Sequence, residues 1–133
     1  MFFLNNLKKY FSKGDKDAET ILPVEEKAVF ELIVDNICIG ILTCADGEWN
    51  FHYTEEFKNV SDQYHRITGF SDLTKTYRSQ ALWPFFRIRI PGLGQPMVRE
   101  TLEKENIDAN NEVALLKRFG YETISNPYRL RVT

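Results

Sequence analysis

The chain has 133 residues and a formal net charge of −2, with 43% hydrophobic and 14% aromatic residues. This length and composition indicate one domain with a real hydrophobic core. Proteins that bind nucleic acid broadly are usually basic over the whole domain, so the acidic balance restricts any such site to a local patch. No run approaches the ~20 apolar residues that span a bilayer. The start, MFFLNN, has too few apolar residues for a signal peptide, so we expect a cytoplasmic protein.

Residues 1–20 are predicted to form a short amphipathic helix and a polar linker, ahead of a main module at residues 21–133. Gly14 is a natural helix stop, and the GDKDAET stretch that begins there is typical of a linker. A basic amphipathic start can touch a membrane surface, but packing on this domain or on a partner is the favoured interpretation. The apolar residues at helical spacing are Phe3, Leu7, Tyr10 and Phe11.

Three antiparallel strands joined by tight turns are predicted from Val29 to Tyr53. The Asp35-Asn36 and Asp46-Gly47 pairs tolerate the positive φ angles that a two-residue hairpin turn needs. Gly40, inside the second strand, indicates a bulge or the close approach of another segment.

One face of this sheet is predicted to carry the core, because Trp49, Phe51 and Tyr53 alternate onto the same side of the third strand. His52 takes the other side and is expected to face solvent. We therefore predict an α+β fold, in which a small antiparallel β-meander sheet is covered by helices on one face. The residues predicted to contribute to the core are Ile33, Ile39, Trp49 and Phe51.

Two helices and a short strand are predicted in the second half of the chain. Pro96 can open the first helix. The second starts with Asn110 or Asn111 as its cap and stops at Gly120. The tail turns at Asn126-Pro127 and ends as a short strand. The residues predicted on the inner side of the first helix are Met97, Thr101 and Leu102.

Motifs for catalysis are absent from the sequence. It contains no glycine-rich loop that could cradle a phosphate and no serine in an elbow motif. Cys38 and Cys44 are interpreted as free thiols, because a zinc site needs about four ligands with paired spacing and His52 and His65 do not supply it. We therefore expect no enzymatic activity, no cofactor and no metal, and a protein that acts by binding.

The stretch LWPFFRIRIPG, from Leu82 to Gly92, concentrates aromatic bulk and positive charge, and its residues leave two geometries open. As a strand, it would direct its isoleucines and its arginines to opposite sides. As a helix that starts at Pro84 and stops at Pro91, it would stack Phe85 on Arg89 one turn later. Propensity favours the strand, whereas the positions of the prolines favour a short helix.

Five motifs follow one another in a recognisable order: Gly40-Ile41-Leu42, Gly47, Phe51 to Tyr53, Glu56-Phe57 and Leu82 to Pro91. This order resembles the N-terminal subdomain of HipA-type kinases, the toxins of a bacterial toxin–antitoxin system. In that family a hairpin with a G-x-L-like end precedes a glycine turn, a strand ending in Tyr and an acidic-aromatic turn. A short Phe-rich helix that runs into Leu-Pro or Ile-Pro comes later. The tail RFGYETISNPYRL is also similar to the ending of stand-alone forms of this module.

The resemblance implies a non-catalytic regulatory subunit. HipA-like kinases continue into a large catalytic domain, and no part of that domain is found in this sequence up to Thr133. In three-gene versions of the system, a small HipS-like protein binds and restrains a shortened, HipT-like serine/threonine kinase. A HipB-like DNA-binding protein accompanies them. Direct contact with nucleic acid and a membrane span are not expected.

On this interpretation Leu82–Pro91 is a short helix that divides its side chains between the core and the kinase. Trp83, Arg87 and Arg89 are predicted to reach outward and bind the partner, because Trp and Arg are enriched at interface hot spots. The residues predicted to pack on the domain are Phe85, Ile88 and Ile90.

The alternative hypothesis is a local nucleic-acid-binding module. Arg87, Arg89 and Arg99 would then bind a single strand together with the neighbouring aromatic residues, since aromatic rings stack on bases and arginines pair with phosphates.

Overall fold

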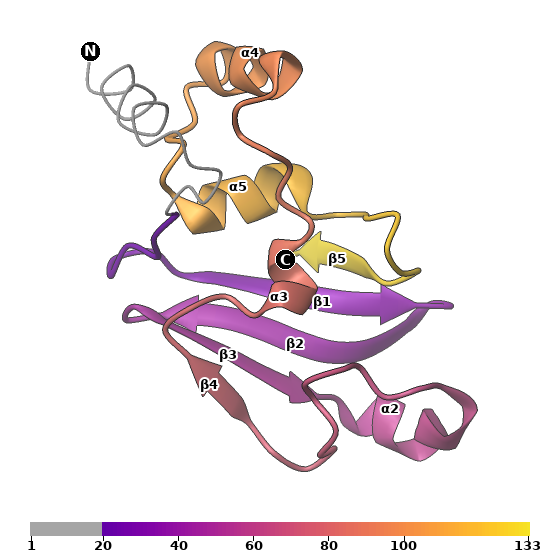
Figure 1. The fold of residues 1–133 in the computed structure, drawn as a ribbon. Coiled ribbons are helices and arrows are strands. Elements are labelled where there is room, and N and C mark those ends of the chain that lie inside the picture. Colours follow the sequence, from indigo (N-terminus) through magenta and orange to yellow (C-terminus); the bar gives the residue numbers. More distant parts are fainter. Residues whose placement is uncertain (1–19) are drawn as a thin grey trace.

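The computed structural model describes residues 20–133, and the amphipathic helix predicted for residues 1–13 lies outside them. Within the described part, five antiparallel strands form one sheet in the order β4-β3-β2-β1-β5, which with the helices confirms the α+β fold (Figure 1). The strands are β1 (Ala28–Val34), β2 (Ile37–Ala45), β3 (Glu48–Tyr53), β4 (Tyr77–Ser79) and β5 (Arg129–Val132). The helices are α2 (Glu55–Val60), α3 (Pro84–Arg87), α4 (Pro96–Lys104) and α5 (Glu112–Phe119), with a 3-10 turn at η1 (Ser61–Gln63).

The predicted meander of β1, β2 and β3 is confirmed. Asp35 and Asn36 join β1 to β2 with φ angles of 50° and 64°, and Asp46 and Gly47 join β2 to β3 with 54° and 75°. Positive φ at both central residues belongs to the hairpin turn whose twist matches that of the flanking strands. These four turn residues therefore set the antiparallel pairing of β1, β2 and β3.

Gly40 fulfils both roles predicted for it. Leu32 pairs with Gly40 while Ile33 pairs with Cys38, so Ile39 is an extra residue that forms a bulge in β2. A Cβ atom on Gly40 would lie 2.4 Å from Cζ of Phe51. The glycine thus leaves space for the Phe51 ring, and the bulge turns Ile39 into the core.

Helices α3 and α5 cover one face of the sheet. Phe86 of α3 and Val113 and Leu116 of α5 belong to the same buried cluster as the inward residues of the strands. Helix α4 lies farthest from the sheet in Figure 1 and packs on α5 through a second cluster, which includes Leu102 and Leu115. The predicted core residues that are fully buried are Ile39, Trp49 and Phe51.

Two residues predicted to face inward do not. Ile33 is half-buried on the far face of β1, because Phe30 and Leu32 take the core positions of that strand. Met97 is 80% exposed on α4, where Val98 takes the inward position instead. In both elements the prediction chose the wrong one of two apolar neighbours.

The helix ends follow local chemistry. Pro96 is the first residue of α4, as predicted. Asn111 caps α5, and its Oδ1 accepts a hydrogen bond from the Ala114 amide at 3.1 Å. The helix ends next to Gly120, again as predicted. Helix α2 is short, because the chain passes into η1 after Val60 and then into extended backbone.

A buried carboxylate ties α5 to the sheet. The Trp49 indole N–H donates to Oε1 of Glu112 at 3.0 Å, and the Thr20 hydroxyl donates to Oε2 at 2.9 Å. The Ile21 backbone adds two hydrogen bonds, one to the Asn110 carbonyl and one from the Glu112 amide. The two side-chain bonds satisfy the Glu112 carboxylate, whose buried charge would otherwise destabilise the core. The two backbone bonds anchor the start of the described chain beside α5.

Candidate docking surface

The Leu82–Pro91 segment forms the short helix that its prolines favour. Pro84 is the first residue of α3, and Trp83 precedes it in extended conformation as the N-cap residue. After one helical turn the backbone continues as tight turns, with the Arg89 amide bonded to the Phe86 carbonyl and the Ile90 amide bonded to that of Arg87. The helical periodicity therefore ends before the second arginine.

Four half-buried aromatic residues lie on the α3 side of the sheet, three of them against the buried ring of Phe70 and the fourth against Phe85; we call them the aromatic patch. They are Tyr77, Trp83, Phe85 and Tyr128.

The patch is held together by ring contacts. The Phe70 ring centroid lies 4.9 Å from that of Tyr77, 5.2 Å from that of Trp83 and 6.5 Å from that of Phe85, with the rings edge to face. Phe85 in turn lies 5.9 Å from Tyr128. Edge-to-face contacts at such distances stabilise ring pairs by about 0.5–1.5 kcal/mol beyond their buried area. Strand β4, helix α3 and the segment before β5 thus present one continuous aromatic surface.

Trp83 keeps a polar group available in this patch. Its ring packs on Phe70, but its indole N–H donates to no residue in the described range 20–133. A half-buried indole with an open donor combines apolar area and a hydrogen bond for a partner. This geometry agrees with the outward role predicted for Trp83, although most of its ring also contributes to the fold.

Arg87 is exposed, as predicted. Its guanidinium donates one long hydrogen bond, of 3.4 Å, to the Leu82 carbonyl. No acidic residue within the described chain pairs with it. The Arg87 charge, next to the aromatic patch in the chain, therefore has no counter-ion among residues 20–133.

Arg89 corrects the prediction, because it is only 4% exposed and points into the domain. Its Nη1 donates to the Gly120 carbonyl at 3.3 Å, and its Nη2 donates to Oδ1 of Asn126 at 3.2 Å and to the Tyr128 carbonyl at 3.0 Å. Burial lowers the pKa of the guanidinium to about 10. The chain turns after α3, so Arg89 lies inward while Ile88, predicted to pack on the domain, is 55% exposed.

Other kinds of site find little support in the described residues. No group of three or more histidine, cysteine or acidic side chains in residues 20–133 could hold a metal ion. Cys44 is buried and Cys38 half-buried, and burial raises the pKa of both thiols, which makes them poor nucleophiles. No helix in this range has the length and apolar character to cross a bilayer.

Sequence reasoning missed three members of the patch. Tyr77, Phe85 and Tyr128 come from segments far apart in the chain, and only the pairing of β4 and β5 with the meander brings them together. Phe85 was predicted only to pack on the domain, and it does so as a half-buried residue against the core cluster. The available signal was the number of aromatic residues, which exceeds what one small core can fully enclose.

A family model of the HipA N-terminal domain matches residues 30–125, which is most of the chain. The protein belongs to the HipA N-terminal domain family. The match runs from β1 through α3 and α5, so this HipA N-terminal domain contains the meander and nearly the whole aromatic patch within the family region. The HipA N-terminal domain is a non-catalytic subdomain, and membership points to a toxin–antitoxin context. No curated protein and no solved structure gives a significant match.

Proposed function

We propose that this HipA N-terminal domain is a non-catalytic regulatory module that docks on a HipA-family, HipT-like serine/threonine kinase and neutralises or modulates it. The observation that carries the proposal is the aromatic patch with Arg87 at its edge. Aromatic and arginine side chains dominate binding energy at protein interfaces, where a few central residues each contribute 2 kcal/mol or more, roughly.

The physical argument rests on what the patch leaves unsatisfied. Trp83 has an open N–H donor, and Arg87 has a charge without an acid partner in residues 20–133. A kinase surface with an acceptor for the indole and a carboxylate for the guanidinium would satisfy both. Arginine can bind a carboxylate with two parallel hydrogen bonds, so Arg87 would also fix the orientation of the complex.

The nucleic-acid alternative loses one of its three arginines. Arg89 is buried under Phe85 and bonds to carbonyl and amide oxygens, so it is not available to a phosphate. An acidic domain that has lost one of the three arginines proposed for phosphate contacts makes a poor electrostatic surface for a polyanion. We therefore favour a protein partner, in the cytoplasm, and expect a HipB-like DNA-binding protein as a further member of the assembly.

The test is a titration of the full chain into a HipT-like kinase by isothermal calorimetry. Trp83→Ala and Arg87→Glu should each weaken binding by about 2 kcal/mol or more. Arg78→Glu is the matched control, because it makes the same charge change on β4 at a residue paired with Asn50, on the face of the sheet away from the helices.

Each possible outcome has a distinct meaning. Loss of affinity in both patch variants, with unchanged binding by Arg78→Glu, would support the proposal. If only Arg78→Glu weakens binding, the kinase binds the open face of the sheet. If the wild-type chain shows no affinity for such a kinase, the proposed function is wrong.

A further inference from the structure

The loop between α5 and β5, residues 121–128, exposes two large apolar side chains to solvent; we call it the 121–128 loop. Ile124 is fully exposed and Tyr121 is about half exposed. Leaving a large aliphatic side chain in water forgoes roughly 1.5–3 kcal/mol relative to its burial. An isoleucine at such a position contributes nothing visible to the stability of this chain.

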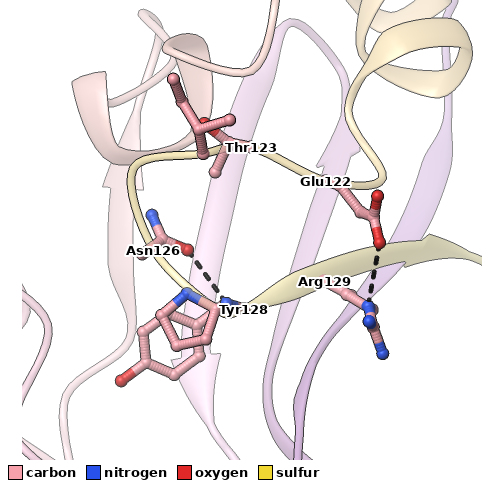
Figure 2. A pocket seen from close by; sticks show the side chains of 7 residues that line it. Glu122, Thr123, Asn126, Tyr128 and Arg129 are labelled. Atoms are coloured by element: carbon pink, nitrogen blue, oxygen red, sulfur yellow. Dashed lines mark hydrogen bonds and ion pairs between the residues drawn. The ribbon is translucent and has the colours of Figure 1, made fainter.

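The loop is nevertheless well ordered by its own hydrogen bonds. The Tyr128 amide donates to Oδ1 of Asn126 at 3.0 Å, and Thr123 and Asn126 form a backbone bridge (Figure 2). The Leu130 amide donates to the Tyr121 carbonyl at 2.9 Å and closes the base of the loop. These bonds fix the backbone that carries Ile124, which lowers the backbone entropy that binding would have to overcome.

Arg89 holds the loop from beneath. Its three hydrogen bonds reach Gly120, Asn126 and Tyr128, so they span the base of the 121–128 loop. Its Nε is buried without a partner, and no carboxylate in the described residues balances its charge. A buried cation without an acid partner is expensive compared with an apolar side chain. Its three hydrogen bonds compensate for part of this cost by fixing the shape of the loop.

The loop adjoins the aromatic patch and is locally neutral. Tyr128 ends the loop and contacts Phe85 of the patch. Glu122 and Arg129 form an ion pair, with 3.2 Å between Oε2 and Nε (Figure 2). Both residues line a hollow of about 390 Å³, together with Ile124 and Pro127. A neutral, apolar tip fits an uncharged apolar recess, and it offers no charge to a phosphate backbone.

We infer that the 121–128 loop is a second docking element, which inserts Ile124 into an apolar recess on the kinase, and that Arg89 is the positioning residue that sets its conformation. This inference rests on the proposed function, and it extends the docking surface from the aromatic patch across Tyr128 to the loop. The partner surface would then have two parts: an acidic and acceptor-bearing part for Arg87 and Trp83, and an apolar part for Ile124.

The first experiment compares two exposed apolar residues in the calorimetric titration with the kinase. Ile124→Ser should raise the Kd about tenfold or more without a change in melting temperature. Met97→Ser is the matched control, because Met97 is also highly exposed but lies on α4, in the helix farthest from the sheet. Its Kd should stay within about twofold of wild type.

A double-mutant cycle tests the role of Arg89. If Arg89→Met acts by releasing the loop, it should weaken binding by itself, and Ile124→Ser should then add little further loss. Hydrogen exchange should become faster at the amides of Tyr128 and Leu130, while the amides of β2 and β3 stay protected. Additive losses would mean that Arg89 does not act through Ile124, and would overturn its positioning role.

The remaining outcomes are equally decisive. If the wild-type chain binds and Ile124→Ser and Met97→Ser both bind like it, the loop is not a docking element while the proposed function stands. If the isolated chain dimerises and Ile124→Ser makes it monomeric, the loop binds a second copy and the inference is wrong. If the wild-type chain does not bind the kinase, the proposed function and this contact fail together.

Discussion

Trp49 and Trp83 lie in one aromatic cluster, yet the two regions use an indole in different ways. Trp49 is fully buried between the sheet and α5, and its N–H is bonded to Glu112. Trp83 is half-buried at the edge of Phe70, and its N–H reaches no acceptor in the described chain. A polar atom that is satisfied inside the fold contributes to stability, whereas one that faces solvent remains available for recognition.

Arg87, in α3, and Arg89, in the turn that follows it, show the same contrast although they are only two residues apart. Arg87 is exposed and pairs with no acidic residue of the described range 20–133, and Arg89 is buried with three oxygen acceptors. Residue type therefore does not separate a docking residue from a structural one. What separates them in this molecule is whether the hydrogen-bonding groups find partners within the domain.

The largest expected effect is the difference between truncating the two tryptophans. Trp49→Ala should destabilise the domain by about 3–5 kcal/mol, because it leaves a cavity in the core and a buried carboxylate without its donor. Trp83→Ala should cost less, about 1–3 kcal/mol, the scale of the two ring contacts that Trp83 makes with Phe70 and Phe86. Urea unfolding followed by circular dichroism measures both, and equal losses would remove the distinction between the two regions.

A second test targets the space that Gly40 leaves for the Phe51 ring. A Cβ atom there would lie 2.4 Å from Cζ and 2.5 Å from Cε1 of Phe51, whose ring is fixed among other buried rings. Gly40→Ala should therefore destabilise the domain by about 1–3 kcal/mol. Gly92→Ala is the control, since its nearest neighbour is the mobile end of Gln95 at 3.2 Å, and its effect should be within about 0.5 kcal/mol.

Replacing each indole by a benzene ring sharpens the comparison. Trp49→Phe keeps an aromatic ring but deprives Glu112 of its indole donor, so we expect a loss of about 1–3 kcal/mol. Trp83→Phe removes an N–H that has no acceptor within residues 20–133 and should change stability by less than about 0.5 kcal/mol. The same variant should nevertheless weaken binding to the kinase. A stability loss of similar size in both variants would show that the Trp83 donor is used inside the fold.

The smallest effect concerns Tyr53, in the closed core. Its hydroxyl donates to the Phe70 carbonyl, and burial raises the pKa of the phenol from 10.0 to about 12. A group whose pKa is raised by folding contributes stability that is complete below the unfolded pKa and is lost as the pH rises from about 10 to about 12. Tyr53→Phe should lose about 1 kcal/mol at neutral pH and show a flatter decline of stability above pH 10, measured by urea unfolding. An unchanged alkaline slope would show that Tyr53 does not titrate with unfolding.

Part of the fold could be predicted because it depends on neighbours in the chain. The turn pairs at residues 35–36 and 46–47, the cap at Asn111 and the helix start at Pro96 all use backbone preferences of one or a few residues. The face of β1 was assigned wrongly although a signal was present. Glu31 and Ile33 lie two residues apart, so they share one face of β1. A charged residue on that face indicates that it faces solvent.

The candidate site was harder to predict, because a partner-binding residue and a core residue can have the same sequence context. Trp83 and Arg87 were proposed from composition, and their surroundings agree with that proposal. Arg89 was proposed on the same grounds and is buried. Helix α3 ends after one turn, and no rule of local periodicity indicates on which side the next residues fall.

The amino-acid sequence by itself determined the meander, the helix ends and the close approach at Gly40, since φ preference, capping and the absence of a side chain act locally. Only the tertiary structure decided that Arg89 holds the 121–128 loop, that Tyr77, Trp83 and Phe85 meet around Phe70, and that Tyr128 joins them through Phe85. These contacts join segments that are distant in the chain. Their formation depends on which surfaces the packed sheet and helices leave open, a property of the whole domain and not of any single stretch.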